Sequence, residues 1–172
     1  MSKSLEISPG THEIADGWKA VIKPINSFDQ VTPSSTAYHE AIHTVAALLT
    51  GSHVKEASRR SGPGFLGRTI LSEFNAIAFI APHAKGCSGT GYDVSVLAIM
   101  GHDPDSLASA ARSVLIGHEG EVHAVASLIE INGSISGYEA KEIMGRVNDP
   151  EAEIKITNPL GEERHFVIKV RG

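Results

Sequence analysis

The segment that most constrains this chain is AYHEAIHTVAALLTG, residues 37–51, because it places two histidines and a glutamate inside one helical pattern. His39 and His43 are four residues apart. A helix therefore brings both imidazoles to one face, about one turn apart, where they can bind one metal ion. Glu40 directly follows the first histidine, so its carboxylate can reach a metal-bound water without being a ligand. The H-E-x-x-H pattern thus predicts a catalytic zinc site in which Glu40 activates the water.

The residues around this motif also favour a helix. Thr32, Ser34 or Ser35 can cap its start, and Pro33 suits a first turn. Gly51 is suited to end it. An apolar stripe runs along the same segment: Ala37, Ala41, Val45, Leu48 and Leu49. On a partly buried helix, two histidines and a glutamate would be costly without a partner such as a metal ion.

Composition restricts the class of protein. The 172 residues suffice for one domain with a substantial core. The formal net charge of −5, with no basic block, argues against nucleic acid and anionic membranes as partners. The chain shows neither a signal-peptide pattern nor an 18-residue apolar run. With Cys87 as the single cysteine, we expect a cytoplasmic protein without a disulfide framework.

A catalytic zinc ion takes three protein ligands and leaves one position for water, so a third ligand must come from elsewhere in the chain. Asp93 is the main candidate, because it lies where a glycine-rich loop gives way to a helical pattern. An acidic residue near a helix start is also a common cap. Spacing alone leaves both roles open for Asp93.

Other side chains are compatible with a metal site. His83 and His102 are alternative third ligands, and Glu56 or Glu73 would be a glutamate ligand from a later segment. A fourth protein ligand, such as His83 or Cys87, would instead indicate a structural zinc ion.

Glycines 62, 64 and 67 match the dinucleotide pattern G-x-G-x-x-G. A nucleotide site needs a strand before this pattern and a helix after it. Here the following residues, FLGRTIL, are rich in β-branched and apolar side chains and predict a strand. A glycine-rich turn is therefore the better interpretation.

The remaining patterns predict a mainly helical α+β fold with short strands. We expect strands at Trp18–Lys23 and within 65–71, a turn through 52–64, and a core helix at 73–82. Further helices, expected to cover the zinc helix, are predicted at Pro104–Ile116, Glu119–Ile131 and Ser136–Val147.

The end of the chain has a different pattern. Two alternating runs, EIKIT and RHFVIKV, flank NPLGEE and predict a C-terminal β-hairpin that Trp18–Lys23 could join. We therefore divide the chain into an N-terminal segment with one strand (1–33), a zinc domain (34–148) and the hairpin (149–172).

Several segments together resemble the peptidase domain of the FtsH family of ATP-dependent zinc metallopeptidases. AYHEAIH resembles that family's AYHEAGHA-type zinc helix, and GFLGRTIL and FNAIAFIAPHAK resemble the strand and helix that follow it. SGTGYDVSVLA is similar to the TTGASNDL-type segment, and LIEINGSISGYEAKEIM to the closing segment. The likeness covers residues 36–146. It implies a zincin-like helical peptidase domain with Asp93 as the third zinc ligand.

The chain also departs from that family. Ile42 replaces a glycine beside the metal and is expected to narrow the site, Pro82-His83 replaces Gly-Arg, and the interval from His43 to Asp93 is shorter. We expect the protein to act without the ATPase module and membrane anchor of that family, because neither is seen in this sequence. The resemblance thus implies a stand-alone zinc peptidase acting on peptides or unfolded proteins, with a separate ATPase or adaptor needed for folded ones. It also implies a homo-oligomer.

Substrate recognition is expected to use the backbone, because the strand around Leu66–Leu71 could pair with an extended peptide. The alternative function is a non-hydrolytic binding or regulatory module that retains a zinc-peptidase scaffold. Ile42 and the shortened interval favour this alternative. The intact Glu40 favours hydrolysis, because a structural zinc site needs no carboxylate that is not a ligand.

Overall fold

The computed structural model describes residues 9–24, 31–32, 35–63, 66–147 and 151–169. These residues contain six helices and seven strands in two antiparallel sheets, which confirms the predicted α+β class. The chain divides into a helical unit, Asp29–Gly145, and a sheet unit made of Met1–Phe28 with Arg146–Gly172. No helix among the described residues is long and apolar enough to cross a membrane.

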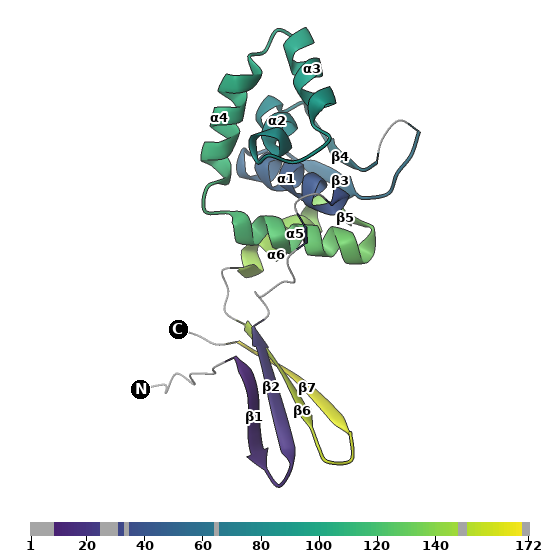
Figure 1. Ribbon diagram of the computed structural model, residues 1–172, viewed down its shortest axis with the longest axis vertical. Helices are drawn as coiled ribbons and strands as arrows, with labels where there is room; N and C mark the ends of the chain where they lie inside the picture. The colour runs from purple at the N-terminus through teal and green to yellow at the C-terminus, as the bar shows by residue number, and fades with distance from the viewer. Residues whose placement is uncertain (1–8, 25–30, 33–34, 64–65, 148–150, 170–172) are drawn as a thin grey trace. The chain divides into compact units, whose positions relative to one another are not determined.

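Helix α1 (Thr36–Leu49) lies at the centre of the helical unit and confirms the helix predicted around H-E-x-x-H (Figure 1). Of the candidate caps, Ser35 begins the helix, and its hydroxyl accepts a hydrogen bond of 3.1 Å from the Tyr38 amide. Gly51 follows the helix with φ of +83°, a conformation that favours glycine. Most of the predicted stripe is buried, whereas Leu49, at the helix end, is exposed.

Five further helices complete the helical unit: α2 (Ala76–Ala84), α3 (Gly91–Ile99), α4 (Pro104–Leu115), α5 (Glu119–Asn132) and α6 (Gly137–Val147). Helices α2, α4 and α5 contact α1, so the predicted covering of the central helix is confirmed for α4 and α5. Helix α2 begins three residues later than predicted because Asn75 caps it. The Asn75 side chain accepts a hydrogen bond of 3.0 Å from the Ala78 amide.

The helical unit also holds a three-stranded sheet in the order β4-β3-β5. Strand β4 (Arg68–Leu71) lies within the segment predicted as a strand, whereas Gly64 and Phe65 fall outside the described residues. Strand β3 (Val54–Ser58) lies in a segment that we predicted as a turn, and that prediction was wrong. Its sequence, VKEAS, has weak strand propensity, but pairing with β4 and with β5 (Ser134–Ser136) on both sides stabilises it.

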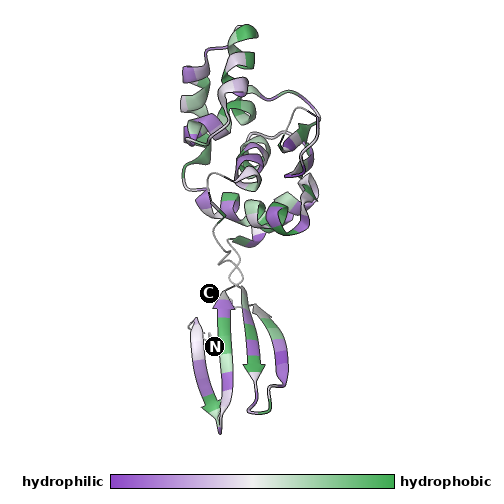
Figure 2. Cartoon of the chain, turned by 45° about the vertical axis from the view of Figure 1, so that its right-hand side comes forward, coloured by the Kyte–Doolittle hydropathy of each residue, from purple (hydrophilic) through white to green (hydrophobic). Residues whose placement is uncertain are grey.

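The sheet unit has four antiparallel strands in the order β1-β2-β6-β7. Strand β2 (Trp18–Pro24) and the hairpin of β6 (Glu151–Thr157) and β7 (Glu163–Lys169) confirm the predictions, including their pairing. Hydrophilic and hydrophobic residues alternate along β6 (Figure 2).

The N-terminal segment has two strands rather than the one predicted, because β1 (Gly10–Ala15) pairs with β2. Strand β1 is exposed throughout and lacks a hydrophobic pattern that would reveal it. The missed signal was the turn Asp16-Gly17, where both residues have positive φ, of 39° and 83°. Such an Asp-Gly pair is typical of a two-residue hairpin turn.

Gly137, at the start of α6, allows this helix to approach β3 closely, which leads to a stability prediction. A side-chain methyl group at Gly137 would overlap the Val54 carbonyl oxygen and lie 2.9 Å from the Val54 Cβ atom. We expect Gly137→Ala to lower the free energy of unfolding by about 3 kcal/mol. Denaturant unfolding followed by far-ultraviolet circular dichroism measures this change.

The matched control is Gly145→Ala in the same helix, where a methyl group would have no neighbour within 4 Å. Alanine is the better helix former, so this substitution should raise stability by about 0.5–1 kcal/mol. Equal stabilities of the two variants would contradict the close packing of α6 on β3.

Candidate metal centre

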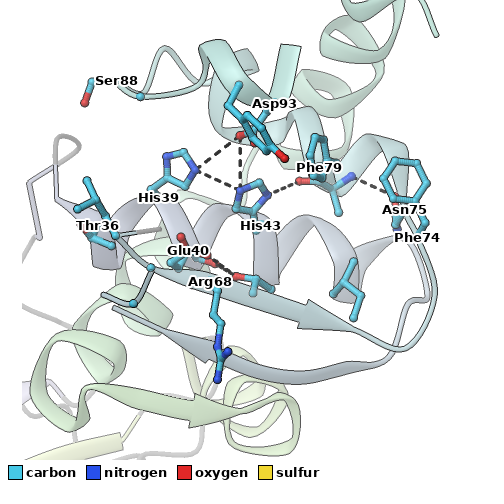
Figure 3. A pocket seen from close by; sticks show the side chains of 18 of the residues that line it. Thr36, His39, Glu40, His43, Arg68, Phe74, Asn75, Phe79, Ser88 and Asp93 are labelled. Atoms are coloured by element: carbon cyan, nitrogen blue, oxygen red, sulfur yellow. Dashed lines mark hydrogen bonds and ion pairs between the residues drawn. The ribbon is translucent and has the colours of Figure 1, made fainter. Parts of the chain in front are cut away.

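Three donor atoms converge between α1 and α3 (Figure 3). The Nε2 atoms of His39 and His43 lie 3.1 Å apart. The Asp93 Oδ2 atom lies 3.8 Å from Nε2 of His39 and 3.9 Å from Nε2 of His43. Donors bound to one tetrahedral zinc ion at about 2.0–2.1 Å would lie roughly 3.3 Å apart. Two imidazoles and one carboxylate at these distances therefore fit a divalent ion, and we call them the three-donor group.

The positions of these side chains follow from their helices. His39 and His43 occupy one face of α1, with ring centroids 4.9 Å apart. Asp93 lies in the first turn of α3, whose N-cap residue is Thr90. Asp93 is thus the third residue of the helix, and its Oδ2 atom lies near the two histidines. Asp93 is therefore not the N-cap residue of α3, and its carboxylate lies where a third metal ligand would be needed.

The environment of the histidines keeps them in the form that binds metal. The Nδ1 atom of His43 lies 2.7 Å from the Ala78 carbonyl oxygen, so Nδ1 carries the proton that it donates and Nε2 keeps its lone pair. Burial, together with the neighbouring His39, lowers the pKa of His43 to about 4. Burial also lowers the pKa of His39. Both rings are therefore neutral near pH 7.

The Glu40 carboxylate is buried in the wall of the same cleft, with only 5% of the residue exposed. The Thr69 hydroxyl on β4 donates a hydrogen bond of 2.7 Å to Glu40 Oε2. Burial raises the pKa of Glu40 to about 7, although the Thr69 hydrogen bond acts in the opposite direction, and nearby Asp93 raises it further. A carboxylate with this pKa can accept and release a proton near neutral pH.

Gly67 lets the chain before β4 come close to α1. A Cβ atom at this position would lie 2.8 Å from the Ser58 carbonyl oxygen and 3.0 Å from the Glu40 Cγ atom. The sequence suggested only a glycine-rich turn here. The structure gives Gly67 a specific role, because a larger residue would displace β4 and with it the Thr69 hydroxyl.

A cleft of about 1010 Å³ contains Glu40 and the three-donor group. Strand β4, at the edge of its sheet, forms one wall, and residues of α1, α2 and α3 form the others. Ile42 is fully buried in the core and does not line this cleft, so the prediction that it narrows the site was wrong. The reason is that the Ile42 side chain packs into the hydrophobic core beside α1 rather than into the cleft.

The other ligands that the sequence offered lie outside the three-donor group: Glu56, Glu73, His83, Cys87 and His102. His83 Nδ1 lies 3.1 Å from the Thr90 hydroxyl, and the Glu56 carboxylate lies 3.7 Å from the Arg68 guanidinium. Within the described part of the chain, no side chain completes a four-donor structural zinc site. Sequence reasoning missed Thr69 and the Ala78 carbonyl, and no local pattern reveals either contact.

No protein-family model, curated protein or solved structure matches this chain. The geometry of the cleft and the chemistry of its side chains therefore carry the functional argument.

The three-donor group predicts that the protein binds one divalent ion, with zinc as the ion tested. Zinc that binds only the folded chain should stabilise it by about 2.7 kcal/mol at a free concentration 100 times the Kd. Asp93→Ala and His43→Ala should lose most of this stabilisation. Elemental analysis and the thermal unfolding midpoint, each with and without a chelator, measure the effect.

His83→Ala is the control, because His83 is exposed and lies outside the group. It should bind and respond to zinc as the parent does. A zinc response in Asp93→Ala equal to that of the parent would show that Asp93 is not a ligand.

Proposed function

We propose that this protein is a zinc metallopeptidase with a zincin-like peptidase domain, which hydrolyses peptide bonds in peptides or unfolded proteins. The observation that carries the proposal is the Glu40 carboxylate, held in the same cleft as the three-donor group but not part of it. A purely structural metal site has no use for such a carboxylate.

His39, His43 and Asp93 would hold the ion. When bound there, zinc polarises the carbonyl of the scissile bond and lowers the pKa of a water molecule. Glu40 takes the proton from the attacking water and then delivers it to the leaving amine. The pKa of Glu40, about 7, suits both transfers. Thr69 positions the carboxylate through the hydrogen bond to Oε2.

Strand β4 supports a peptide as the substrate. It is an edge strand of its sheet, and Arg68, Thr69 and Leu71 line the cleft. An extended peptide can add to such an edge through backbone hydrogen bonds, which recognise the main chain whatever the side chains are. This mode of binding suits unfolded segments, so folded substrates would need delivery by a separate ATPase or adaptor.

The alternative function is a non-hydrolytic binding module on the same scaffold. Of the two features that favoured it, Ile42 and the shortened interval from His43 to Asp93, the first no longer does so. Ile42 was expected to obstruct the metal site, but its side chain lies in the core. The open cleft beside the three-donor group favours hydrolysis instead.

Glu40→Gln tests the proposed reaction, because glutamine keeps the shape of the side chain but removes the base. We expect kcat on an unfolded casein substrate to fall by about 10²–10³-fold while zinc content stays unchanged. Cleavage assays at matched zinc loading measure this difference. Zinc-loaded parent protein that cleaves neither casein nor a peptide library would contradict the peptidase proposal.

Thr69 is tested by a pair of substitutions. Thr69→Val keeps the size and branching of the side chain but removes the hydroxyl, so we expect kcat to fall about tenfold with zinc content unchanged. Thr69→Ser keeps the donor and should retain most of the parent rate. If the serine variant were as slow as the valine variant, the shape of Thr69 rather than its hydrogen bond would matter.

A further inference from the structure

We propose that two copies of this chain form a dimer through the sheet unit, with strand β7 of one copy pairing antiparallel to β7 of the other. Strand β7 is the last in the order β1-β2-β6-β7 and lies at one edge of that sheet (Figure 1). An edge strand presents backbone groups that can pair with another chain. The two four-stranded sheets then join into one continuous sheet. This interface lies outside residues 36–146 and does not depend on the proposed peptidase function.

The two edges of the sheet unit differ in regularity. The pairing of β1 with β2 shifts register between Glu13 and Ala15, and such an irregularity turns an edge strand away from further partners. Strand β7, ERHFVIK, pairs with β6 residue by residue along its whole length and contains neither proline nor glycine. Its backbone therefore has the regular form that a further strand needs, whereas that of β1 does not.

The hairpin turn shows which residues of β7 direct backbone groups to the free edge. The amide of Asn158 donates a hydrogen bond of 3.0 Å to the carbonyl oxygen of Glu162, so the backbone groups of these two opposite residues point toward each other. Along an antiparallel strand this direction alternates from one residue to the next. The N–H and C=O groups of Glu163, His165 and Val167 therefore point away from β6, and no other strand of the described chain meets them.

A second copy fits this edge because the sequence of β7 is self-complementary in the antiparallel direction. With Phe166 on the twofold axis, His165 lies opposite Val167 of the partner subunit, and both have outward backbone groups. Glu163 then lies opposite position 169, which is a lysine in the sequence. Opposite charges thus meet at both ends of the paired strands, and no like charges lie directly opposite each other. The register gives about eight hydrogen bonds between the two strands.

The pairing also covers apolar side chains that the single sheet exposes to water. Phe166 is 46% exposed and Val167 is 66% exposed. Phe166 lies opposite Ile154 on β6, which lies opposite Ile22 on β2, so the three form an apolar row across the sheet. In the dimer Phe166 is next to Phe166 of the partner subunit, as a cross-strand aromatic pair. The two apolar rows become one, and removing their surface from water favours association.

Amide hydrogen exchange of the unmodified protein, followed by NMR between about 50 μM and about 1 mM, tests the pairing. The amides of His165 and Val167 should exchange at least about tenfold more slowly at the higher concentration, because they are hydrogen-bonded only in the dimer. The amide of Thr11 is the internal control. The same alternation, counted across β6 and β2, directs it to the free edge of β1, so its exchange should not change with concentration.

Val167→Pro tests the interface by substitution. Because the Val167 amide points away from β6, proline leaves the hydrogen bonds between β6 and β7 intact and removes a donor only from the free edge. Sedimentation of the full-length protein should give a dissociation constant about 30–100-fold higher than that of the parent, because two interstrand hydrogen bonds are lost per dimer.

Thr11→Pro makes the same change on the β1 edge and is the matched control, so it should dimerise as the parent does. Zinc content should stay unchanged in both variants, since neither residue lines the cleft. Far-ultraviolet circular dichroism checks that both variants fold, and if Val167→Pro does not, the exchange data on the parent decide alone.

Several outcomes would overturn the dimer. They are a parent that stays monomeric at millimolar concentration, and β7 amides whose exchange does not depend on concentration. A dimer that Thr11→Pro weakens as much as Val167→Pro would also place the interface elsewhere. Because the interface and the cleft are separate, a protein that dimerises through β7 but cleaves no peptide would contradict only the peptidase proposal.

Discussion

The arrangement of this cleft depends on the hydrogen bond between His43 Nδ1 and the Ala78 carbonyl oxygen, 2.7 Å long. It joins α1 to α2 and fixes which nitrogen of His43 carries the proton, so that Nε2 is available to a metal ion. Because Asn75 holds the same turn of α2 through Ala78, the orientation of a metal-binding ring and the position of Phe79 are set together.

A second constraint is the buried carboxylate of Glu40. A charged group with so little exposure is costly unless a donor compensates it, and the Thr69 hydroxyl is that donor. The close approach of β4 to α1 makes this contact, and Gly67 permits the approach because it has no Cβ. The edge strand β4 therefore also orients the Glu40 carboxylate, so in the proposed reaction the same strand would bind the peptide and position the base.

The elements that the sequence predicted correctly have strong local signals. Helix α1 has a cap, an apolar stripe and a terminal glycine. The β6-β7 hairpin has an alternating first strand, and a turn rich in Asn, Pro and Gly precedes the second strand. The strands it missed, β1, β3 and β5, have weak or very short strand patterns and form because neighbouring strands supply their hydrogen-bond partners. Pairing between distant segments is not encoded in the local pattern, so propensity alone underestimates such strands.

The sequence by itself determined the pair His39 and His43, because a spacing of four residues on a helix places two side chains on one face wherever that helix lies. It also placed Glu40 next to the first histidine as the expected base. For the third ligand it offered Asp93 as the main candidate, together with His83, His102, Glu56 and Glu73. Only the tertiary structure brought the Asp93 carboxylate near the two imidazoles and buried Ile42 in the core. It also brought the Thr69 hydroxyl to the Glu40 carboxylate and the Ala78 carbonyl to the His43 ring. Those contacts join segments far apart in the chain, and their geometry depends on how helices and strands pack rather than on any local spacing.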